Sequence, residues 1–113
     1  MIDQIQPAQL ADWIQSKASF GPTVVLDVRE AWELQTASVK ADGFALQTMP
    51  MQTIPARLDE LSREQPIACL CHHGGRSMQV AAFLAQQGFS HVANIAGGIN
   101  AWSAQIDPSV PRY

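Results

Sequence analysis

Residues 66–88 read PIACLCHHGGRSMQVAAFLAQQG, a stretch that contains a strand, a short loop and a helix in immediate succession. The apolar run at 66–70 has the length of a β-strand, and residues 78–87 read as a helix that ends at Gly88. The loop between them begins with Cys71. Because the unpaired N–H groups of the first helical turn and the positive end of the helix dipole would face this thiol, its thiolate form is favoured. A thiolate is the reactive form of cysteine, so the pattern predicts an enzyme with a sulfur nucleophile.

The same alternation of strand and helix extends along the whole chain. Strands are expected over 2–5, 23–26, 44–46, 66–70 and 91–95, and helices from Pro7 onward, around 30–35, over 55–64, over 78–87 and in a last short segment with Ile99 and Trp102. This order predicts an α/β layered fold with a mostly parallel sheet, whose ligand site lies beyond the C-terminal strand ends. Cys71 stands at such an end. The stretch 36–50 carries the weakest signal, and the tail 107–111 reads as simply extended.

The composition is that of one small globular domain. With 113 residues and 47% hydrophobic side chains the chain can build a single core, and we expect one domain over residues 1–113. A net charge of -3 gives no broad basic face for nucleic acid or acidic lipid. No run approaches the roughly 18 apolar residues of a spanning helix, and no signal-peptide pattern opens the sequence, so a cytoplasmic protein is expected.

Three motifs stand in a fixed order: VLDVRE at 25–30 with Trp32 and Glu33 behind it, CHHGGRS at 71–77, and IAGGINAW at 95–102. In order and spacing they resemble a single-domain rhodanese, the sulfurtransferase homology domain. The resemblance implies a five-stranded, mostly parallel sheet with helices on both faces and a catalytic cysteine at the base of a six-residue loop. One departure is SVKADG at 38–43, where many relatives carry Gly-His-Ile-Pro-Gly. The chain path between Thr36 and Leu46 therefore stays open.

The resemblance also implies a function. A rhodanese-like sulfurtransferase moves a sulfane sulfur from thiosulfate or a persulfide donor to a thiol or cyanide, through a persulfide on Cys71. This is covalent catalysis in two half-reactions, a role that suits only cysteine among the side chains. No cofactor is expected. The expected partners are a small-molecule donor and acceptor, with a protein sulfur donor or acceptor as an alternative, and neither nucleic acid nor membrane.

The candidate substrate-binding residues follow the nucleophile directly: His72, His73, Gly74, Gly75, Arg76 and Ser77. Because a persulfide is anionic near neutral pH, the backbone N–H groups of residues 72–77 are expected to form a nest around the sulfur, and the two glycines permit the curl. Arg76 is expected to pin the loop or to hold an oxyanion such as the sulfonate end of thiosulfate. Each imidazole either adds a donor or is an exposed side chain with no task.

Other polar and sulfur-containing residues are interpreted as structural. Asp27 and Arg29 stand at a neighbouring strand end, where an approach to the pocket is one alternative. A structural ion pair, or an acid that bonds to loop amides, is the favoured interpretation. Cys69 is expected to be a small buried apolar residue, and its disulfide with Cys71 would be badly strained, so both thiols should be reduced. The remaining interpretations are turn and core packing for Gly97, Gly98 and Trp102, and core or pocket wall for Met49, Met51 and Met78.

A cysteine-dependent phosphatase is the nearest alternative, because it also uses a thiolate in an anion-cradling loop closed by arginine. The phosphatase signature has five residues between cysteine and arginine, whereas only four, residues 72–75, separate Cys71 from Arg76. A loop shorter by one residue should fit a lone sulfur atom better than a phosphoryl group. In addition, Leu70 stands where phosphatases usually have histidine.

Two further alternatives concern the same loop. The segment CLCHH at 69–73 holds two thiols and two imidazoles, which are zinc or copper ligands, but adjacent histidines diverge and the usual spacer between ligands is absent. No metal is therefore expected. A sulfur carrier or interaction module without efficient turnover of small molecules is the other alternative. The intact loop from Cys71 to Arg76 argues against a module without chemistry, while a carrier stays open.

Overall fold

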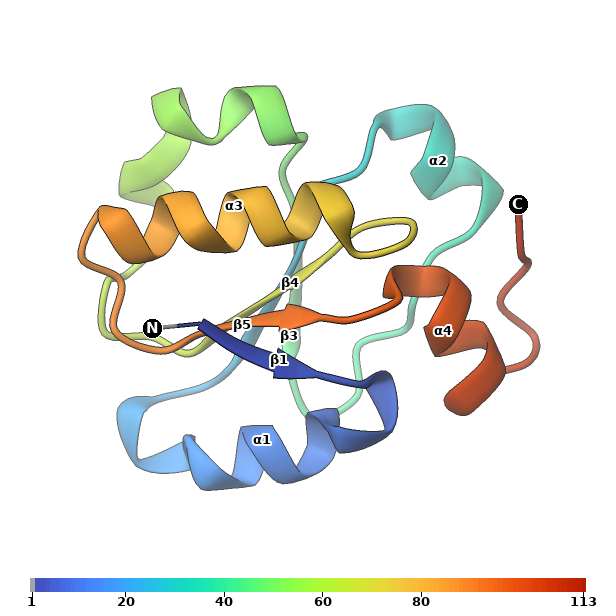
Figure 1. Ribbon diagram of the computed structural model, residues 1–113, viewed down its shortest axis with the longest axis horizontal. Helices are drawn as coiled ribbons and strands as arrows, with labels where there is room; N and C mark the ends of the chain where they lie inside the picture. Colours follow the sequence, from blue (N-terminus) through green and yellow to red (C-terminus); the bar gives the residue numbers. More distant parts are fainter. Residues whose placement is uncertain (1) are drawn as a thin grey trace.

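A five-stranded parallel sheet lies between layers of helices in the computed structural model, which describes residues 2–113 (Figure 1). The strands are β1 (Ile2–Ile5), β2 (Val24–Asp27), β3 (Ala45–Thr48), β4 (Ile67–Leu70) and β5 (Val92–Ile95), in the spatial order β1-β5-β4-β2-β3. All four neighbouring pairs are parallel. The predicted fold class is thus confirmed, and β4, the strand that leads to Cys71, is the central one.

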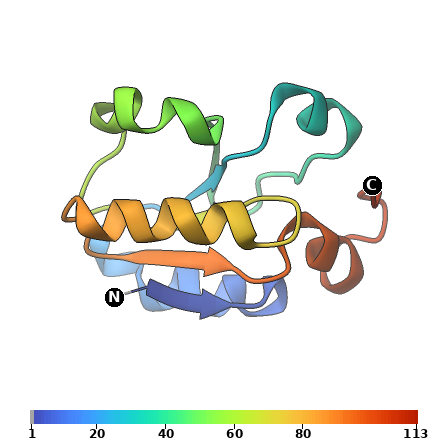
Figure 2. The same ribbon diagram turned by 45° about the horizontal axis from the view of Figure 1, so that its top comes forward.

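Helices cover both faces of this sheet. They are α1 (Leu10–Ser16), α2 (Ala31–Thr36), α3 (Gly75–Gln86) and α4 (Gly98–Gln105), together with the 3-10 helices η1 (Pro7–Gln9), η2 (Ala18–Phe20), η3 (Met51–Thr53) and η4 (Pro55–Glu60). Figure 2 shows α3 on one side of the sheet and α1 on the other. Within residues 2–113, no helix combines the length and the apolar character needed to cross a bilayer.

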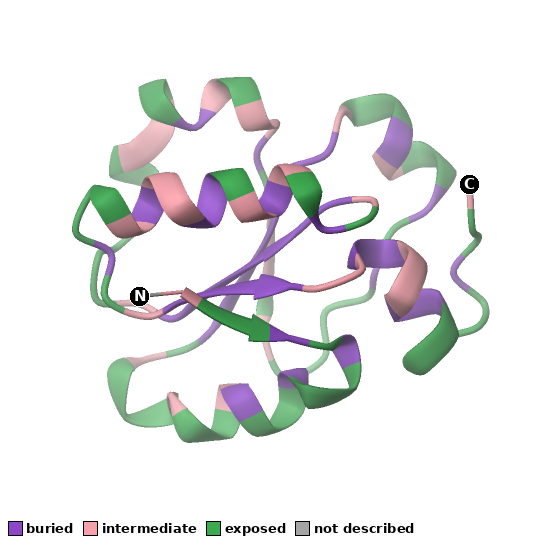
Figure 3. Ribbon diagram, viewed as in Figure 1, coloured by how far each residue is buried: buried purple, intermediate pink, exposed green. Residues whose placement is uncertain are grey.

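The inner strands are buried on both faces, as a parallel sheet between helices requires (Figure 3). Their side chains alternate between two core clusters. One cluster packs against α3 and includes Leu26, Cys69 and Leu84, and the other packs against α1 and α4 and includes Val25 and Leu70. Two successive residues of one strand thus pack into clusters on opposite faces of the sheet. For this reason the inner strands are continuous apolar runs in the sequence, without alternating polar residues.

The structure corrects the prediction of a helix over 55–64. The helical segment is the 3-10 helix η4, which ends at Glu60, and its bonds run from Arg57 N–H to the Ile54 carbonyl and from Leu61 N–H to the Leu58 carbonyl. Pro55 supplies no N–H at the start, and Leu61 is extended and buried, so the chain leaves the helix to fill the core.

Two other segments differ from the expectation. In the stretch after α2, where the sequence signal is weak, Ala37 and Val39 are buried in the core cluster on the α1 side of the sheet. Strand β3 follows and begins at Ala45. The tail is also more than an extended chain, because Val110 is buried and its N–H bonds to the Asp107 carbonyl. Buried apolar side chains at irregular spacing hold both segments, and such spacing gives no periodic signal in the sequence.

Candidate active site

The loop after β4 places the Cys71 thiol at the N-terminus of α3. The backbone nitrogen of Gly74 lies 3.1 Å from the Cys71 Sγ atom and donates a hydrogen bond to it. Cys71 itself is only 1% exposed. The helix begins at Gly75, three residues before the predicted start, so that Gly75, Arg76 and Ser77 form its first turn. The thiol therefore lies at the base of the loop beside the N-terminus of α3, with the Gly74 N–H directed at its sulfur.

Gly74 is the residue that lets the loop curl. It adopts φ +103°, the left-handed region, and a Cβ atom here would lie 3.0 Å from the Gly97 backbone nitrogen. Gly75 has an ordinary φ, and a Cβ there would meet nothing within 4 Å. Of the two glycines predicted to permit the curl, only Gly74 is thus required by the backbone geometry.

The first turn of α4 holds the loop from the other side. The N–H of Ile99 donates to the Cys71 carbonyl at 2.8 Å, and the N–H of Asn100 donates to the His72 carbonyl at 3.2 Å. Gly98, with φ +58°, has no space for a side chain, because a Cβ atom would overlap both of these carbonyl groups. The sequence interpretation of Gly97 and Gly98 as turn and packing residues is therefore incomplete, since this turn binds the loop directly.

Arg76 is the cation of the loop, and it forms a bidentate ion pair with Glu33 of α2. Its Nη1 and Nη2 atoms lie 2.6 and 2.7 Å from the two carboxylate oxygens. These bonds lower the pKa of the Glu33 carboxyl to about 2, with help from the Tyr113 hydroxyl, and they raise the pKa of Arg76. The sequence predicts that Arg76 either pins the loop or holds an oxyanion, and this ion pair corresponds to the first of these roles.

Asp27 and Arg29 form a second ion pair at the end of β2. The Arg29 Nη2 atom lies 2.7 Å from Asp27 Oδ2, and both side chains are almost completely buried. The prediction of a structural ion pair is confirmed. Arg29 also donates from Nη1 to the Tyr113 hydroxyl at 3.0 Å, so this pair is connected to the tail of the chain.

The two histidines of the loop are stacked. The ring centroids of His72 and His73 are 3.9 Å apart, and the other face of His72 stacks on Tyr113 at 3.8 Å with an interplanar angle of 6°. Burial in this stack lowers the pKa of His72, and the neighbouring His73 acts in the same direction. His73 itself is exposed. The two imidazoles therefore occupy different environments, which adjacent positions in a sequence cannot reveal.

Ser77 faces the core instead of the mouth of the loop. It is completely buried, and its hydroxyl donates to Asn94 Oδ1 of β5 at 2.6 Å. The amide nitrogen of Asn94 in turn donates to the Gly74 carbonyl at 3.3 Å and to Gln4 Oε1 at 3.0 Å. These bonds fasten the loop and the first turn of α3 to β5.

The other sulfur-containing residues are part of the packing. Cys69 is fully buried, as predicted, and burial raises the pKa of its thiol to about 12. Met49 is buried in the core, whereas Met51 packs at its edge and Met78 is half-buried. Among residues 2–113, no three side chains of the histidine, cysteine, aspartate and glutamate types come together as metal ligands.

Comparison with known proteins fits this site. The sequence model of the rhodanese-like domain matches residues 7–105 of the chain. The chain belongs to the rhodanese-like family. This rhodanese-like chain is 33% identical over 110 residues to a sulfurtransferase of Allochromatium vinosum, covering 97% of the chain and 96% of that relative.

Two other comparisons concern a longer relative, matched by sequence, and a solved structure, matched by fold. Rhodanese-like/PpiC domain-containing protein 12, chloroplastic, of Arabidopsis thaliana is 38% identical over 116 residues, which are 99% of the chain but only 38% of that protein. The crystal structure of a rhodanese-like domain protein from Staphylococcus aureus superposes with a TM-score of 0.75 at 23% identity, with 99% of both chains covered. The second comparison shows the same fold.

Three residues of this rhodanese-like site, Glu33, Asn94 and Tyr113, have no role assigned by any sequence pattern. Glu33 stands behind the first motif, and an acid that is buried on a short helix needs a cationic partner. Tyr113 lies 80 positions from Glu33, and its hydroxyl bonds to that carboxylate at 2.6 Å. No local pattern in the sequence connects them.

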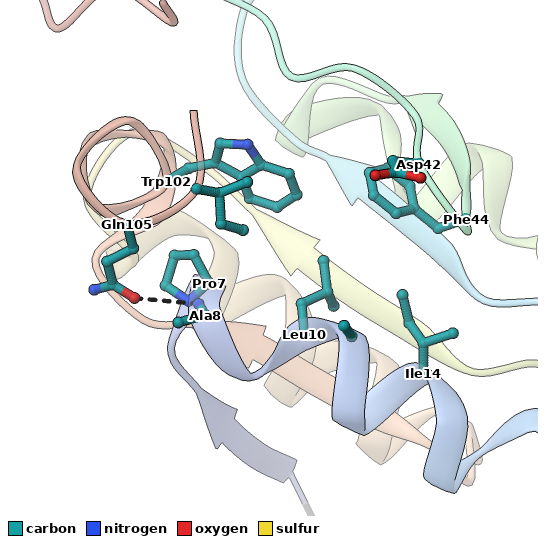
Figure 4. Close-up of a pocket in the computed structure, with 10 residues that line it drawn as sticks. Pro7, Ala8, Leu10, Ile14, Asp42, Phe44, Trp102 and Gln105 are labelled. Carbon is teal, nitrogen blue, oxygen red and sulfur yellow. Dashed lines mark hydrogen bonds between the residues drawn. The ribbon is translucent and has the colours of Figure 1, made fainter. Parts of the chain in front are cut away.

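A separate groove of about 370 Å³ lies between α1, α4 and the segment before β3 (Figure 4). Leu10, Ile14, Phe44 and Trp102 give it an apolar lining, and Phe44 meets Trp102 edge to face at 6.0 Å. None of the loop residues 71–77 lines it. With neither a nucleophile nor a cation in its lining, this groove has no part in the chemistry of Cys71.

Proposed function

We propose that the chain transfers a sulfane sulfur from thiosulfate or a low-molecular-weight persulfide to a nucleophilic acceptor through a persulfide on Cys71. In the first half-reaction the thiolate attacks the outer sulfur of thiosulfate, the donor S–S bond breaks, and sulfite leaves with the electron pair. In the second, cyanide or a thiolate attacks the outer sulfur of the persulfide. As the bond between the acceptor and this sulfur forms, the S–S bond to Cys71 breaks, and its electron pair regenerates the Cys71 thiolate.

The observation that supports this proposal best is the bond from the Gly74 N–H to the Cys71 sulfur at 3.1 Å. It directs a main-chain dipole at the sulfur atom that attacks the donor in the first half-reaction. Donors fixed in advance around a charged sulfur need no reorganisation during the reaction, which is the usual basis of anion stabilisation in enzymes.

The donor is proposed to bind at the outer side of the loop. Glu33 uses two of the five N–H groups of Arg76, whose side chain is 37% exposed, so the others are free to bind the sulfonate of thiosulfate. The exposed ring of His73 would supply a further donor when protonated. A partner protein that carries a sulfane sulfur could dock at the same side of the loop.

We also propose that the protein works in a reducing, cytoplasmic location, in keeping with the two free thiols.

Intact-mass spectrometry after incubation with thiosulfate tests the proposal. We expect the wild type to gain one sulfur atom that cyanide removes, Cys71→Ser to gain none, and Cys69→Ala to behave as the wild type. A sulfur adduct that persists in Cys71→Ser would refute the assignment. A persulfide that forms while thiocyanate production stays slow would identify a sulfur carrier instead.

The phosphatase alternative has its own test. Because four residues separate Cys71 from Arg76, we propose that the chain does not turn over phosphate esters at a useful rate. Hydrolysis of an aryl phosphate by the wild type, lost in Cys71→Ser, would contradict this.

A further inference from the structure

The tail after α4 follows a defined path to the active-site loop. The side chain of Asp107 accepts bonds from the backbone N–H and the hydroxyl of Ser109, and the Ser103 hydroxyl donates to the Val110 carbonyl at 2.7 Å. Val110 itself is buried in the core. These contacts carry the chain across α4, so that its C-terminal end lies beside α2 (Figure 1).

Tyr113 is the residue that this path delivers to the site. Its hydroxyl donates to Glu33 Oε2 at 2.6 Å and accepts a bond from Arg29 Nη1 at 3.0 Å. The hydroxyl therefore joins the ion pairs Asp27–Arg29 and Glu33–Arg76 into one chain of bonds. This chain extends from the end of β2 to the first turn of α3, and Tyr113 stands in its middle.

The ring of Tyr113 has a second task, which concerns His72. It covers one face of the imidazole at 3.8 Å, nearly parallel, while His73 covers the other face. The Nε2 atom of His72 is buried and makes no hydrogen bond with any of residues 2–113. Two rings thus enclose the imidazole of the residue directly after the nucleophile.

We propose that Tyr113 is a positioning residue of the persulfide loop, with its hydroxyl steadying the Glu33–Arg76 brace and its ring holding His72. This inference rests on the proposed sulfur transfer at Cys71. Tyr113 acts through the groups that flank the sulfur. Its loss should therefore misplace the loop without removing any group that reacts.

Three variants separate the two tasks. Tyr113→Phe removes the hydroxyl and keeps the ring, Tyr113→Ala removes both, and Arg112→Ala changes the exposed neighbour in the same tail. We expect the rate of persulfide formation from thiosulfate to fall roughly threefold to tenfold in Tyr113→Phe, because the hydroxyl's bonds to Glu33 and Arg29 are lost while both ion pairs remain. In Tyr113→Ala we expect a fall of roughly tenfold to a hundredfold. Arg112→Ala should match the wild type.

The titration of His72, followed by NMR, gives a readout that does not depend on activity. The groups that face this ring are His73, Glu33, Arg76 and Tyr113. Removing the Tyr113 ring lessens the burial that lowers the pKa of His72, so we expect this pKa to rise in Tyr113→Ala and to stay near the wild-type value in Tyr113→Phe.

The outcomes separate the two proposals. Unchanged persulfide rates and an unchanged His72 titration in a folded Tyr113→Ala would overturn the role of Tyr113, even if the melting temperature fell. If Tyr113→Ala does not fold, the rate of Tyr113→Phe decides, and a wild-type rate refutes the inference. If the wild type itself forms no persulfide, the proposed function fails. The His72 titration then still supports or refutes positioning by the ring.

Discussion

The absence of a side chain at Gly98 allows the backbone of α4 to approach the active-site loop. Its backbone lies against the carbonyl groups of Cys71 and His72, with φ in the left-handed region. The closeness lets Ile99 donate to the Cys71 carbonyl. The sulfur-bearing residue is therefore held by a main-chain bond from the first turn of α4, and position 98 tolerates only glycine.

Gly98→Ala should lower the free energy of unfolding by about 2 to 4 kcal/mol, since it combines steric overlap with an unfavourable φ. The matched control is Gly43→Ala, because Gly43 also has positive φ, +77°, but a Cβ atom there meets nothing within 4 Å. That variant should lose only about 1 to 2 kcal/mol. Urea denaturation of both measures the difference, and equal losses would show that the overlap at Gly98 is relieved by movement of the loop.

At the scale of elements, β5 is tied to the α3 N-terminus by one polar pair inside the core. Asn94 is 3% exposed and accepts from the Ser77 hydroxyl while it donates to the Gly74 carbonyl. A buried polar side chain in a strand weakens the core unless all of its groups are bonded. Here it joins a strand, a loop and a helix.

Ser77→Ala leaves the Asn94 Oδ1 atom buried without its donor, so we expect a loss of about 1 to 3 kcal/mol in the free energy of unfolding. Ser90→Ala is the matched control, because Ser90 is exposed and its side chain makes no hydrogen bond with any of residues 2–113. Thermal denaturation at neutral pH compares them. A melting temperature of Ser77→Ala equal to that of the control would mean that the Ser77–Asn94 bond adds nothing to stability.

At the scale of the whole molecule, Glu33 connects three distant segments. Its carboxylate binds Arg76 of α3 and Tyr113 of the tail while it belongs to α2, and its side chain is only 3% exposed. The pKa of Glu33 is lowered from 4.5 to about 2, chiefly by the bond to Arg76. A carboxyl with a lowered pKa stabilises the fold fully above its unfolded pKa and loses this effect as the pH falls through its folded pKa.

The wild type should therefore lose up to about 3 kcal/mol of stability from this carboxyl as the pH falls from 4.5 to 2. Glu33→Gln should be less stable at pH 6 and show a flatter dependence within that window. Glu60→Gln is the control, since its ion pair with Arg57 is exposed. Urea denaturation at several pH values measures the slopes, and parallel curves for the wild type and Glu33→Gln would contradict the role of Glu33.

Local sequence determined much of this protein. Apolar runs before Cys71 and around Val25 specify buried parallel strands, and the loop with Gly74 and Arg76 specifies a thiol at a helix N-terminus, because these properties depend on neighbouring residues. The tertiary structure alone decided which partners complete the site. Glu33, Asn94, Gly98 and Tyr113 reach the loop from four separate segments, and bonds between residues tens of positions apart leave no periodicity or spacing in the sequence.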